Sequence, residues 1–294
     1  MKRPTENVTT TPAGAVEVEV LGSGAPVLVL HGSPGGIDQA RAMSRFLGED
    51  QFKTICVSRP GYLGTPLDPT DPSIDHEADL LLAVLDALGV TRVSVLAYSG
   101  GGPSAYRLAI RHPGRVSALV AIAAVGSRYV PAKATASDRF VFGTRTGQRL
   151  VEYLARRSPG RLVGSALASE GSIRGDELKA ATASAMADPE QRAAVLAIST
   201  TAGWRGPRKA GWNNDVANFG AIDTLELDRV RCPVLLIHGD ADTDVTIDFS
   251  YSAHTALPDS TLVVMERGTH LAFYAHPQAP DVQAQARNWL AGRA

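Results

Sequence analysis

The 294-residue sequence lacks several features that would assign it to specialised classes of protein. It has only two cysteines, Cys56 and Cys232, and no Cys-x-x-Cys or His-x-x-x-His spacing, so neither a disulfide scaffold nor a metal site is indicated. No apolar run approaches the roughly 18 residues that a membrane-spanning helix needs. Residues 4–13 are polar and threonine-rich where a secretory signal would be apolar. We therefore predict a cytoplasmic protein with two buried core thiols, no metal and no membrane association.

The sequence also lacks an excess of charge of either sign. It has 29 basic and 30 acidic residues and a pI of about 6.7. A balance of this kind gives no electrostatic basis for binding nucleic acid or an anionic membrane surface. We expect a small-molecule substrate that is not a polyanion, and the sequence leaves the oligomeric state open.

The hydrophobic pattern predicts one α/β core interrupted by an insertion. Six short apolar runs suit buried strands, and most are followed by segments with helical periodicity: 27–30, 53–58, 93–97, 116–124, 232–238 and 261–265. Residues 15–21 alternate valine with glutamate and predict a half-exposed antiparallel edge strand. Residues 127–228 show helical patches around 145–156, 176–187 and 190–200 and no convincing strand. We predict a flexible N-terminus (1–14), a core (15–126 and 229–294) and a helical cap (127–228).

The segment around Ser99 carries the most specific chemical signal. The apolar run 93–97 predicts a buried strand, and Ser104–His112 predicts a helix that ends before Pro113. Ser99 therefore lies at a sharp turn between a strand and a helix, where residues two positions away must be small. Ala97 and Gly101 are both small. The pattern is that of a nucleophile elbow, with alanine in place of the usual first glycine.

This glycine-rich turn has two other interpretations. Gly100, Gly102 and Ala105 fit the G-x-G-x-x-G/A pattern of a dinucleotide-binding turn. That motif expects an acidic residue about 20 positions later to hold the ribose, and residues 121–127 contain no acid. A purely structural turn is the second alternative. Both are less consistent with the sequence than a serine nucleophile, and we predict no cofactor.

A serine nucleophile needs a histidine base and an acid that orients it. The carboxyl ends of parallel strands carry the active residues of open α/β sheets. Residues 234–238 are followed by Asp240, Asp242 and Asp244, and residues 261–265 are followed by His270. The chain order of serine, aspartate and histidine is the one found in α/β-hydrolases.

These motifs resemble those of the α/β-hydrolase fold superfamily, over about residues 15–126 and 229–293. The resemblance implies a mostly parallel, eight-stranded-type sheet flanked by helices, with a helical cap. It also implies a catalytic triad of Ser99, His270 and Asp242, since the acid commonly follows a strand-end His-Gly by three residues. Asp240 and Asp244 are then expected to hold the loop or cap a helix.

The same resemblance implies an oxyanion hole formed by two main-chain N–H groups, those of Ser33 and Gly100. The glycine-rich segment 31–36 follows a strand and presents such groups above the sheet. Because these donors belong to the main chain, we expect Ser33→Ala to have little effect. We expect His31 to order this loop rather than transfer protons. The candidate substrate contacts are Tyr62, Tyr98, Trp204 and Trp212, and packing of the cap on the core is the alternative for the tryptophans.

The resulting prediction is a serine hydrolase that cleaves a small carboxylic ester through an acyl-enzyme. Residues 31–36 are also similar to the His-Gly-Gly-Pro-Gly loop of proline iminopeptidases, which makes an aminopeptidase or amidase the alternative. That family holds the free amine of its substrate with acids in the cap, and the sequence does not single one out among these: Glu152, Glu170, Asp176, Glu177 and Asp215. Non-hydrolytic members of the superfamily, namely lyases, perhydrolases and ligand receptors, are further alternatives.

Overall fold

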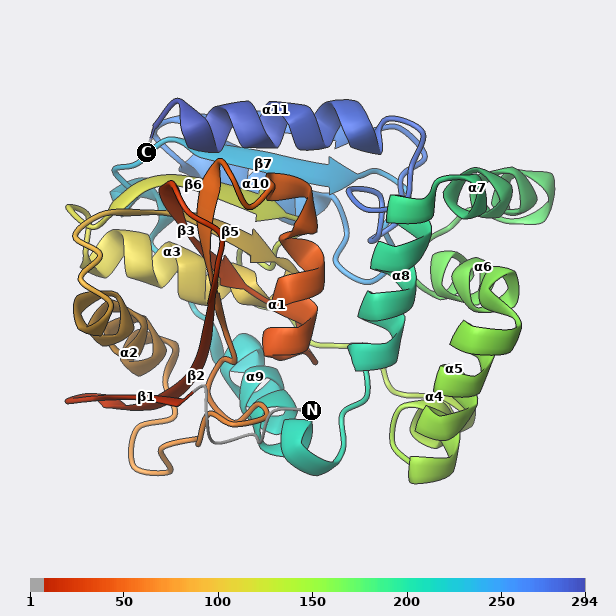
Figure 1. Ribbon diagram of the computed structural model, residues 1–294, viewed down its shortest axis with the longest axis horizontal. Helices are drawn as coiled ribbons and strands as arrows, with labels where there is room; N and C mark the ends of the chain where they lie inside the picture. Colours follow the sequence, from red (N-terminus) through yellow and green to blue (C-terminus); the bar gives the residue numbers. More distant parts are fainter. Residues whose placement is uncertain (1–7, 294) are drawn as a thin grey trace.

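A single mixed sheet forms the centre of the computed structural model, which describes residues 8–293 (Figure 1). The sheet has eight strands in the order β1-β2-β4-β3-β5-β6-β7-β8. The strands are β1 Val8–Thr11, β2 Gly14–Leu21, β3 Ala25–Leu30, β4 Phe52–Val57, β5 Val93–Tyr98, β6 Val116–Ile122, β7 Val234–Gly239 and β8 Ser260–Met265. Strands β3 to β8 are parallel, and β2 pairs antiparallel with β4. The predicted mostly parallel sheet is confirmed.

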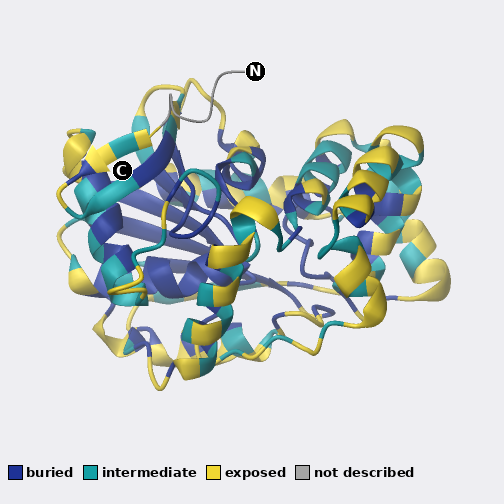
Figure 2. Cartoon of the chain, turned by 90° about the horizontal axis from the view of Figure 1, so that it is seen from below, coloured by how far each residue is buried: buried dark blue, intermediate teal, exposed yellow. Residues whose placement is uncertain are grey.

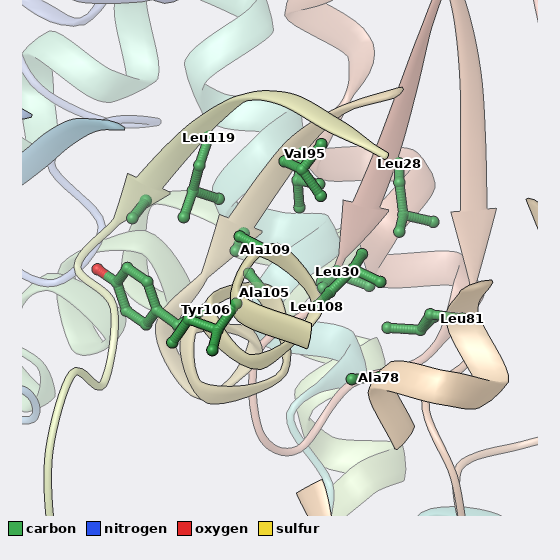
Figure 3. Close-up of a cluster of buried hydrophobic side chains, with 14 of the residues drawn as sticks. Leu28, Leu30, Ala78, Leu81, Val95, Ala105, Tyr106, Leu108, Ala109 and Leu119 are labelled. Carbon is green, nitrogen blue, oxygen red and sulfur yellow. The ribbon is translucent and has the colours of Figure 1, made fainter. Parts of the chain in front are cut away.

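Helices cover both faces of this sheet. They are α1 Ile37–Met43, α2 Ile74–Ala87, α3 Gly102–Arg111, α10 Asp248–Ala256 and α11 Ala279–Ala291. The strands are buried because alternate side chains point to opposite faces, each covered by helices. Leu28 and Leu30 pack toward α2 and α3 with Val95 and Leu119 (Figure 3). Val27 and Val29 belong to the cluster on the opposite face, which includes residues of α1 and α11.

Six helices of the described chain lie between β6 and β7, within the predicted cap. They are α4 Ala136–Val141, α5 Arg145–Arg157, α6 Pro159–Ser169, α7 Gly175–Ala187, α8 Pro189–Thr201 and α9 Lys209–Ala221. Helices α4 to α8 lie beyond the carboxyl ends of the strands, and many of their outward residues are exposed (Figures 1 and 2). Helix α9 returns to the core, where Phe219 joins the hydrophobic cluster of the sheet. These six helices are called the cap below, and α9 at their C-terminal end packs on the core.

The prediction of a flexible N-terminus is wrong for residues 8–14, and residues 1–7 lie outside the described chain. Val8–Thr11 forms strand β1, whose backbone pairs antiparallel with β2. The edge of the sheet is thus β1, not the strand predicted over residues 15–21. A four-residue strand with three threonines has little hydrophobic pattern, and its pairing with β2 supplies the hydrogen bonds that define it. Among the helices described, none is long and apolar enough to span a bilayer.

Candidate active site

Ser99 lies at the turn that the sequence predicts, between β5 and α3. Its backbone has a φ of 51°, in the left-handed region that non-glycine residues rarely adopt. A methyl group on Gly101 would lie 2.6 Å from the Leu30 carbonyl oxygen, so only glycine fits there. The short 3₁₀ turn η3 (Ser99–Gly101) leads directly into α3. The strained turn therefore places the Ser99 side chain at the strand end, where it lines a cavity.

Asp242 and His270 meet at the ends of β7 and β8. The distance between His270 Nδ1 and Asp242 Oδ2 is 2.6 Å, and both side chains are almost fully buried. Asp242 Oδ1 accepts hydrogen bonds from the main-chain N–H groups of Asp244 and Val245, at 2.9 and 3.1 Å. His238 Nε2 lies 3.1 Å from Asp242 Oδ2. These contacts fix the carboxylate so that one oxygen faces His270.

The electrostatic surroundings favour a charged His270. Burial lowers the pKa of His270, but the ion pair and hydrogen bond with Asp242, together with Asp244 and Glu170, outweigh burial and raise it. Burial raises the pKa of Asp242, but the contacts with His270 and His238 outweigh burial and hold this pKa below its ordinary value. His270 Nε2 lies 3.8 Å from Asp244 Oδ2. The imidazole therefore has carboxylates on both sides of the ring.

Asp244 connects His270 with the cavity that Ser99 lines. The Asp244 carboxylate lies 3.8 Å from His270 Nε2 and forms part of the cavity wall. The Tyr98 ring, next to Ser99 in the chain, lies 5.0 Å from the His270 ring, centre to centre. Within residues 8–293, no hydrogen bond joins Ser99 to His270, and the Ser99 hydroxyl has no hydrogen-bond partner. The structure thus brings Asp242 and His270 into contact and places Ser99 at the same end of the sheet. Hydrogen bonds at active sites commonly shorten only when substrate binds.

The loop after β3 packs against the turn at Ser99. A methyl group on Gly32 would lie 3.3 Å from Ser99 Cβ, and one on Gly100 would overlap the Ser33 side chain. His31 is buried, with Nδ1 2.7 Å from the Gly32 carbonyl oxygen and Nε2 accepting from the Arg59 N–H. Burial is the main cause that lowers the pKa of His31. A neutral, doubly hydrogen-bonded His31 orders the loop, as predicted.

The main-chain N–H groups of Ser33 and Gly100 are both available at this junction. Within the described residues, the Ser33 N–H donates to no hydrogen-bond acceptor. Gly100 lies in the first turn of η3, where main-chain N–H groups have no partner inside the helix. Both residues line the cavity with Ser99. Two donors without partners beside a serine side chain suit a ligand with a negatively charged oxygen.

The cavity has a volume of about 350 Å³ and lies between the strand ends and the cap. Trp204, Trp212, Phe219 and Tyr129 supply most of its aromatic wall. The Trp204 and Trp212 rings are stacked, with centres 5.6 Å apart and planes at 16°. Two of the four candidate substrate contacts therefore line the cavity. The other two do not line it and are buried: Tyr98 lies beside His270, and the Tyr62 hydroxyl donates to Asp215 of helix α9.

A buried network of charged groups joins this cavity to the core, and the sequence analysis missed it. Arg59 is 1% exposed and bonds to two carboxylates, Glu77 at 2.8 Å and Asp215 at 2.8 Å. Asp215 comes from α9 of the cap and also accepts a hydrogen bond from the Tyr62 hydroxyl at 2.6 Å. The Ser33 hydroxyl bonds to Asp215 as well. Partners up to 182 residues apart in the chain leave no local sequence signal.

A second part of the cap contacts Asp242 and His270 through the main chain. The loop between α6 and α7 forms an antiparallel bridge from Gly171 to Asp242. The His270 N–H donates to the Glu170 carbonyl at 3.0 Å, and the Ser172 N–H donates to the Ala241 carbonyl at 2.8 Å. Burial raises the pKa of the Glu170 carboxyl to about 7, with His270 opposing the rise and Asp244 and Asp242 adding to it. The cap thus holds both loops that follow β7 and β8.

The remaining titratable groups show no arrangement suited to a metal. Within residues 8–293, no group of three or more His, Cys, Asp or Glu side chains is spaced to bind a metal ion. Cys56 and Cys232 are free and buried, as predicted, and burial raises the pKa of their thiols to about 12 and about 11.

Comparison with known proteins identifies the family. A solved α/β hydrolase fold protein from Nakamurella multipartita is 43% identical and has a TM-score of 0.94, with 97% of this chain and 99% of that chain covered. The uncharacterized hydrolase YcgS of Bacillus subtilis (strain 168) is 25% identical over 276 residues, which cover 92% of this chain and 93% of that protein. A thermophilic esterase from Thermogutta terrifontis, 21% identical over 97% of both chains, shares the fold with a TM-score of 0.66. The model of the α/β hydrolase fold family matches residues 25–277. The chain therefore belongs to the α/β-hydrolase fold family of enzymes.

Proposed function

We propose that this enzyme hydrolyses a small carboxylic ester, with Ser99 as nucleophile, His270 as general base and acid, and Asp242 as the group that orients His270. The observation that carries the proposal is the 2.6 Å contact of His270 with Asp242, at the end of the sheet where Ser99 lines the cavity. In this mechanism His270 Nδ1–H donates a hydrogen bond to Asp242, which leaves Nε2 to accept the Ser99 proton. The unpartnered Ser99 hydroxyl is free to turn toward that nitrogen.

The reaction proceeds in two stages. Ser99 Oγ attacks the carbonyl carbon while its proton passes to His270 Nε2, and the carbonyl oxygen becomes an oxyanion. The oxyanion accepts hydrogen bonds from the main-chain N–H groups of Ser33 and Gly100. Collapse of the intermediate breaks the ester bond, and His270 gives its proton to the departing alkoxide. Water then attacks the acyl-enzyme by the same steps and frees Ser99.

The cavity supports a substrate with an aromatic or other flat apolar group. Its volume of about 350 Å³ lies at the lower end of the range for small-molecule sites. The stacked rings of Trp204 and Trp212 offer a flat apolar surface on the cap side of the cavity. We propose that these two side chains contact the acyl or alcohol group of the ester.

The test is hydrolysis of p-nitrophenyl esters by the wild type and Ser99→Ala. We expect kcat/KM to fall by at least about a thousandfold, because the nucleophile of the acyl-enzyme is lost. A fluorophosphonate should label Ser99 in the wild type and give no adduct in the variant. Near-normal turnover by Ser99→Ala would exclude the mechanism, and failure of the wild type to react with either probe would exclude an activated serine.

One observation keeps the proline iminopeptidase-like alternative as a second candidate. Four of the five cap acids have a basic partner: Asp215 pairs with Arg59, Glu177 with Arg267, Glu152 with Arg156 and Asp176 with Lys179. Glu170 is different, because it lies beside His270 and Asp244 and makes no side-chain hydrogen bond within residues 8–293. In this alternative, the Glu170 carboxylate forms an ion pair with the amine of the substrate. Faster hydrolysis of a proline anilide than of a short-chain p-nitrophenyl ester, lost in Glu170→Gln, would favour this alternative.

A further inference from the structure

The charged network around Arg59 reaches the proposed oxyanion hole through the side chain of Ser33. Arg59 Nη1 donates to Ser33 Oγ at 3.2 Å and to Asp215 Oδ2 at 3.0 Å, and the Ser33 hydroxyl donates to the same Asp215 oxygen. The Ser33 hydroxyl is thus held on one side by a guanidinium and on the other by a carboxylate. Fixing the side chain in this way restricts the rotation of the Ser33 main chain, whose N–H is the proposed oxyanion donor.

Close packing gives the Ser33 side chain little freedom to adopt another position. A methyl group built on Gly100 would lie 2.1 Å from Ser33 Oγ and 2.7 Å from Ser33 Cβ. Ser33 therefore lies directly against the residue that supplies the second proposed donor. A small rotation at Ser33 would change the separation of the two N–H groups, and oxyanion stabilisation depends on donors held within a few tenths of an ångström.

The two carboxylates that pair with the buried Arg59 come from different parts of the chain. Arg59 is fully buried, and a buried guanidinium needs compensating carboxylates. Glu77 supplies one from the core helix α2, at 2.8 Å, but does not contact Ser33. Asp215 supplies the second from α9 and is the acceptor for the Ser33 hydroxyl. Burial lowers the pKa of Arg59, but Asp215 and Glu77 outweigh burial and raise it, so the guanidinium stays charged.

We infer that Asp215 is a positioning residue, which acts through the hydroxyl of Ser33 to align the oxyanion hole when cap helix α9 is docked on Arg59. The inference rests on the proposed function. It differs from the expectation that Ser33→Ala has little effect, because that expectation takes only the main-chain N–H into account. It also gives the cap a role in catalysis that is separate from substrate contact.

The experiment compares Ser33→Ala, Asp215→Asn and the double variant in steady-state hydrolysis of p-nitrophenyl butyrate. Deletion of an oxyanion donor costs about 10² to 10³ in kcat, and misalignment should cost less. We expect each single variant to lower kcat about ten- to thirtyfold with KM changed less than about threefold. The double variant should be no worse than the poorer single variant, because both changes break one linkage. The affinity of phenylboronic acid, which places an oxygen in the oxyanion hole, should fall by the same factor.

Glu77→Gln is the matched control, because it removes one carboxylate partner of Arg59, as Asp215→Asn does, but Glu77 does not contact Ser33. It should lower the thermal unfolding temperature about as much as Asp215→Asn while kcat stays within about threefold of the wild type. Ser33→Ala leaves the Arg59–Asp215 pair intact and decides the matter alone if Asp215→Asn does not fold.

Three results would overturn the inference: kcat of Ser33→Ala within twofold of the wild type, effects that multiply in the double variant, or a loss of kcat in Glu77→Gln equal to that in Asp215→Asn. Failure of the proposed function is distinguishable from these results. In that case the wild type itself neither hydrolyses the ester nor reacts with a fluorophosphonate.

Discussion

The cap meets the core at two places that differ in the kind of contact they use. On the Ser33 side, the contact is made by side chains, with Asp215 of α9 bonded to Arg59. On the His270 side, it is made by main-chain hydrogen bonds and the bridge between Gly171 and Asp242. A side-chain contact depends on the residue identities, whereas a main-chain contact depends on close approach of the backbones. The cap contact on the Ser33 side should therefore respond to changes of charge, and the cap contact on the His270 side to changes of size.

The largest effect should come from the His270 side when the carboxylate of Asp242 is removed. Asp242→Asn should lower kcat by about 10³ to 10⁴, because the amide no longer orients His270 or stabilises its charged form. Steady-state kinetics with a p-nitrophenyl ester measures this. Asp240→Asn is the control, since Asp240 is a neighbouring exposed acid bonded to the Arg267 N–H, and its kcat should stay within about threefold. If Asp242→Asn keeps a tenth of the activity, Asp242 is not the orienting acid.

A smaller effect should follow when a methyl group is added at the main-chain contact. A methyl on Gly171 would lie 2.3 Å from Thr269 Cγ2, and Thr269 is the buried neighbour of His270. Gly171→Ala should therefore push the cap loop away, lower kcat about tenfold and destabilise the fold by about 1–3 kcal/mol. Urea denaturation and ester kinetics measure the two effects. Gly160→Ala is the control, because its methyl would meet only Met186 Cγ at 3.9 Å. Equal behaviour of the two variants would remove the distinction between the two cap contacts.

The smallest effect should be a shift in pH dependence. The acid limb of kcat/KM follows the pKa of His270 in the free enzyme, because only neutral His270 can accept the Ser99 proton. Since Asp242, Asp244 and Glu170 raise this pKa, the limb should lie above the ordinary histidine value of about 6.5. Asp244→Asn removes one of these carboxylates, so the pKa should fall and the limb should move to lower pH, by up to about one unit.

The control for this shift is Glu266→Gln, which removes an exposed charge from the loop that carries His270. Its pH profile should overlay that of the wild type. A limb that stays in place or moves to higher pH in Asp244→Asn would mean that Asp244 does not face the imidazole in solution.

The sequence predicted the parts of the fold whose hydrophobic pattern is local. The strands that end at Ser99 and before Asp242 and His270 are apolar on both faces, and their helices show regular apolar spacing. The turn at Ser99 was predicted because only small residues fit around it, and the φ of 51° agrees. The choice of Asp242 needed the family resemblance, since spacing alone left three aspartates. Its contact with His270 agrees with that choice.

The parts that were missed depend on contacts between distant residues. Helix α9 contains Gly211, Gly220 and three asparagines, which have low helix propensity, and its place is set by Asp215 and Phe219 packing against the core. Helices α4 and α6 also went unpredicted, and α6 contains a proline and two glycines. Asp244 was expected to hold a loop, and its approach to His270 arises only when β7 and β8 lie side by side. No window of sequence contains both partners of these contacts.

The stacked indoles of Trp204 and Trp212 make the ultraviolet circular dichroism of the enzyme sensitive to the position of cap helix α9. They are two of only three tryptophans in the chain, and their planes are nearly parallel at 5.6 Å. Two chromophores at this separation couple when they absorb, so their circular dichroism in the ultraviolet depends on their mutual orientation. Trp204 precedes α9 and Trp212 lies within it. Movement of α9 away from the core is thus observable without a label or a substrate.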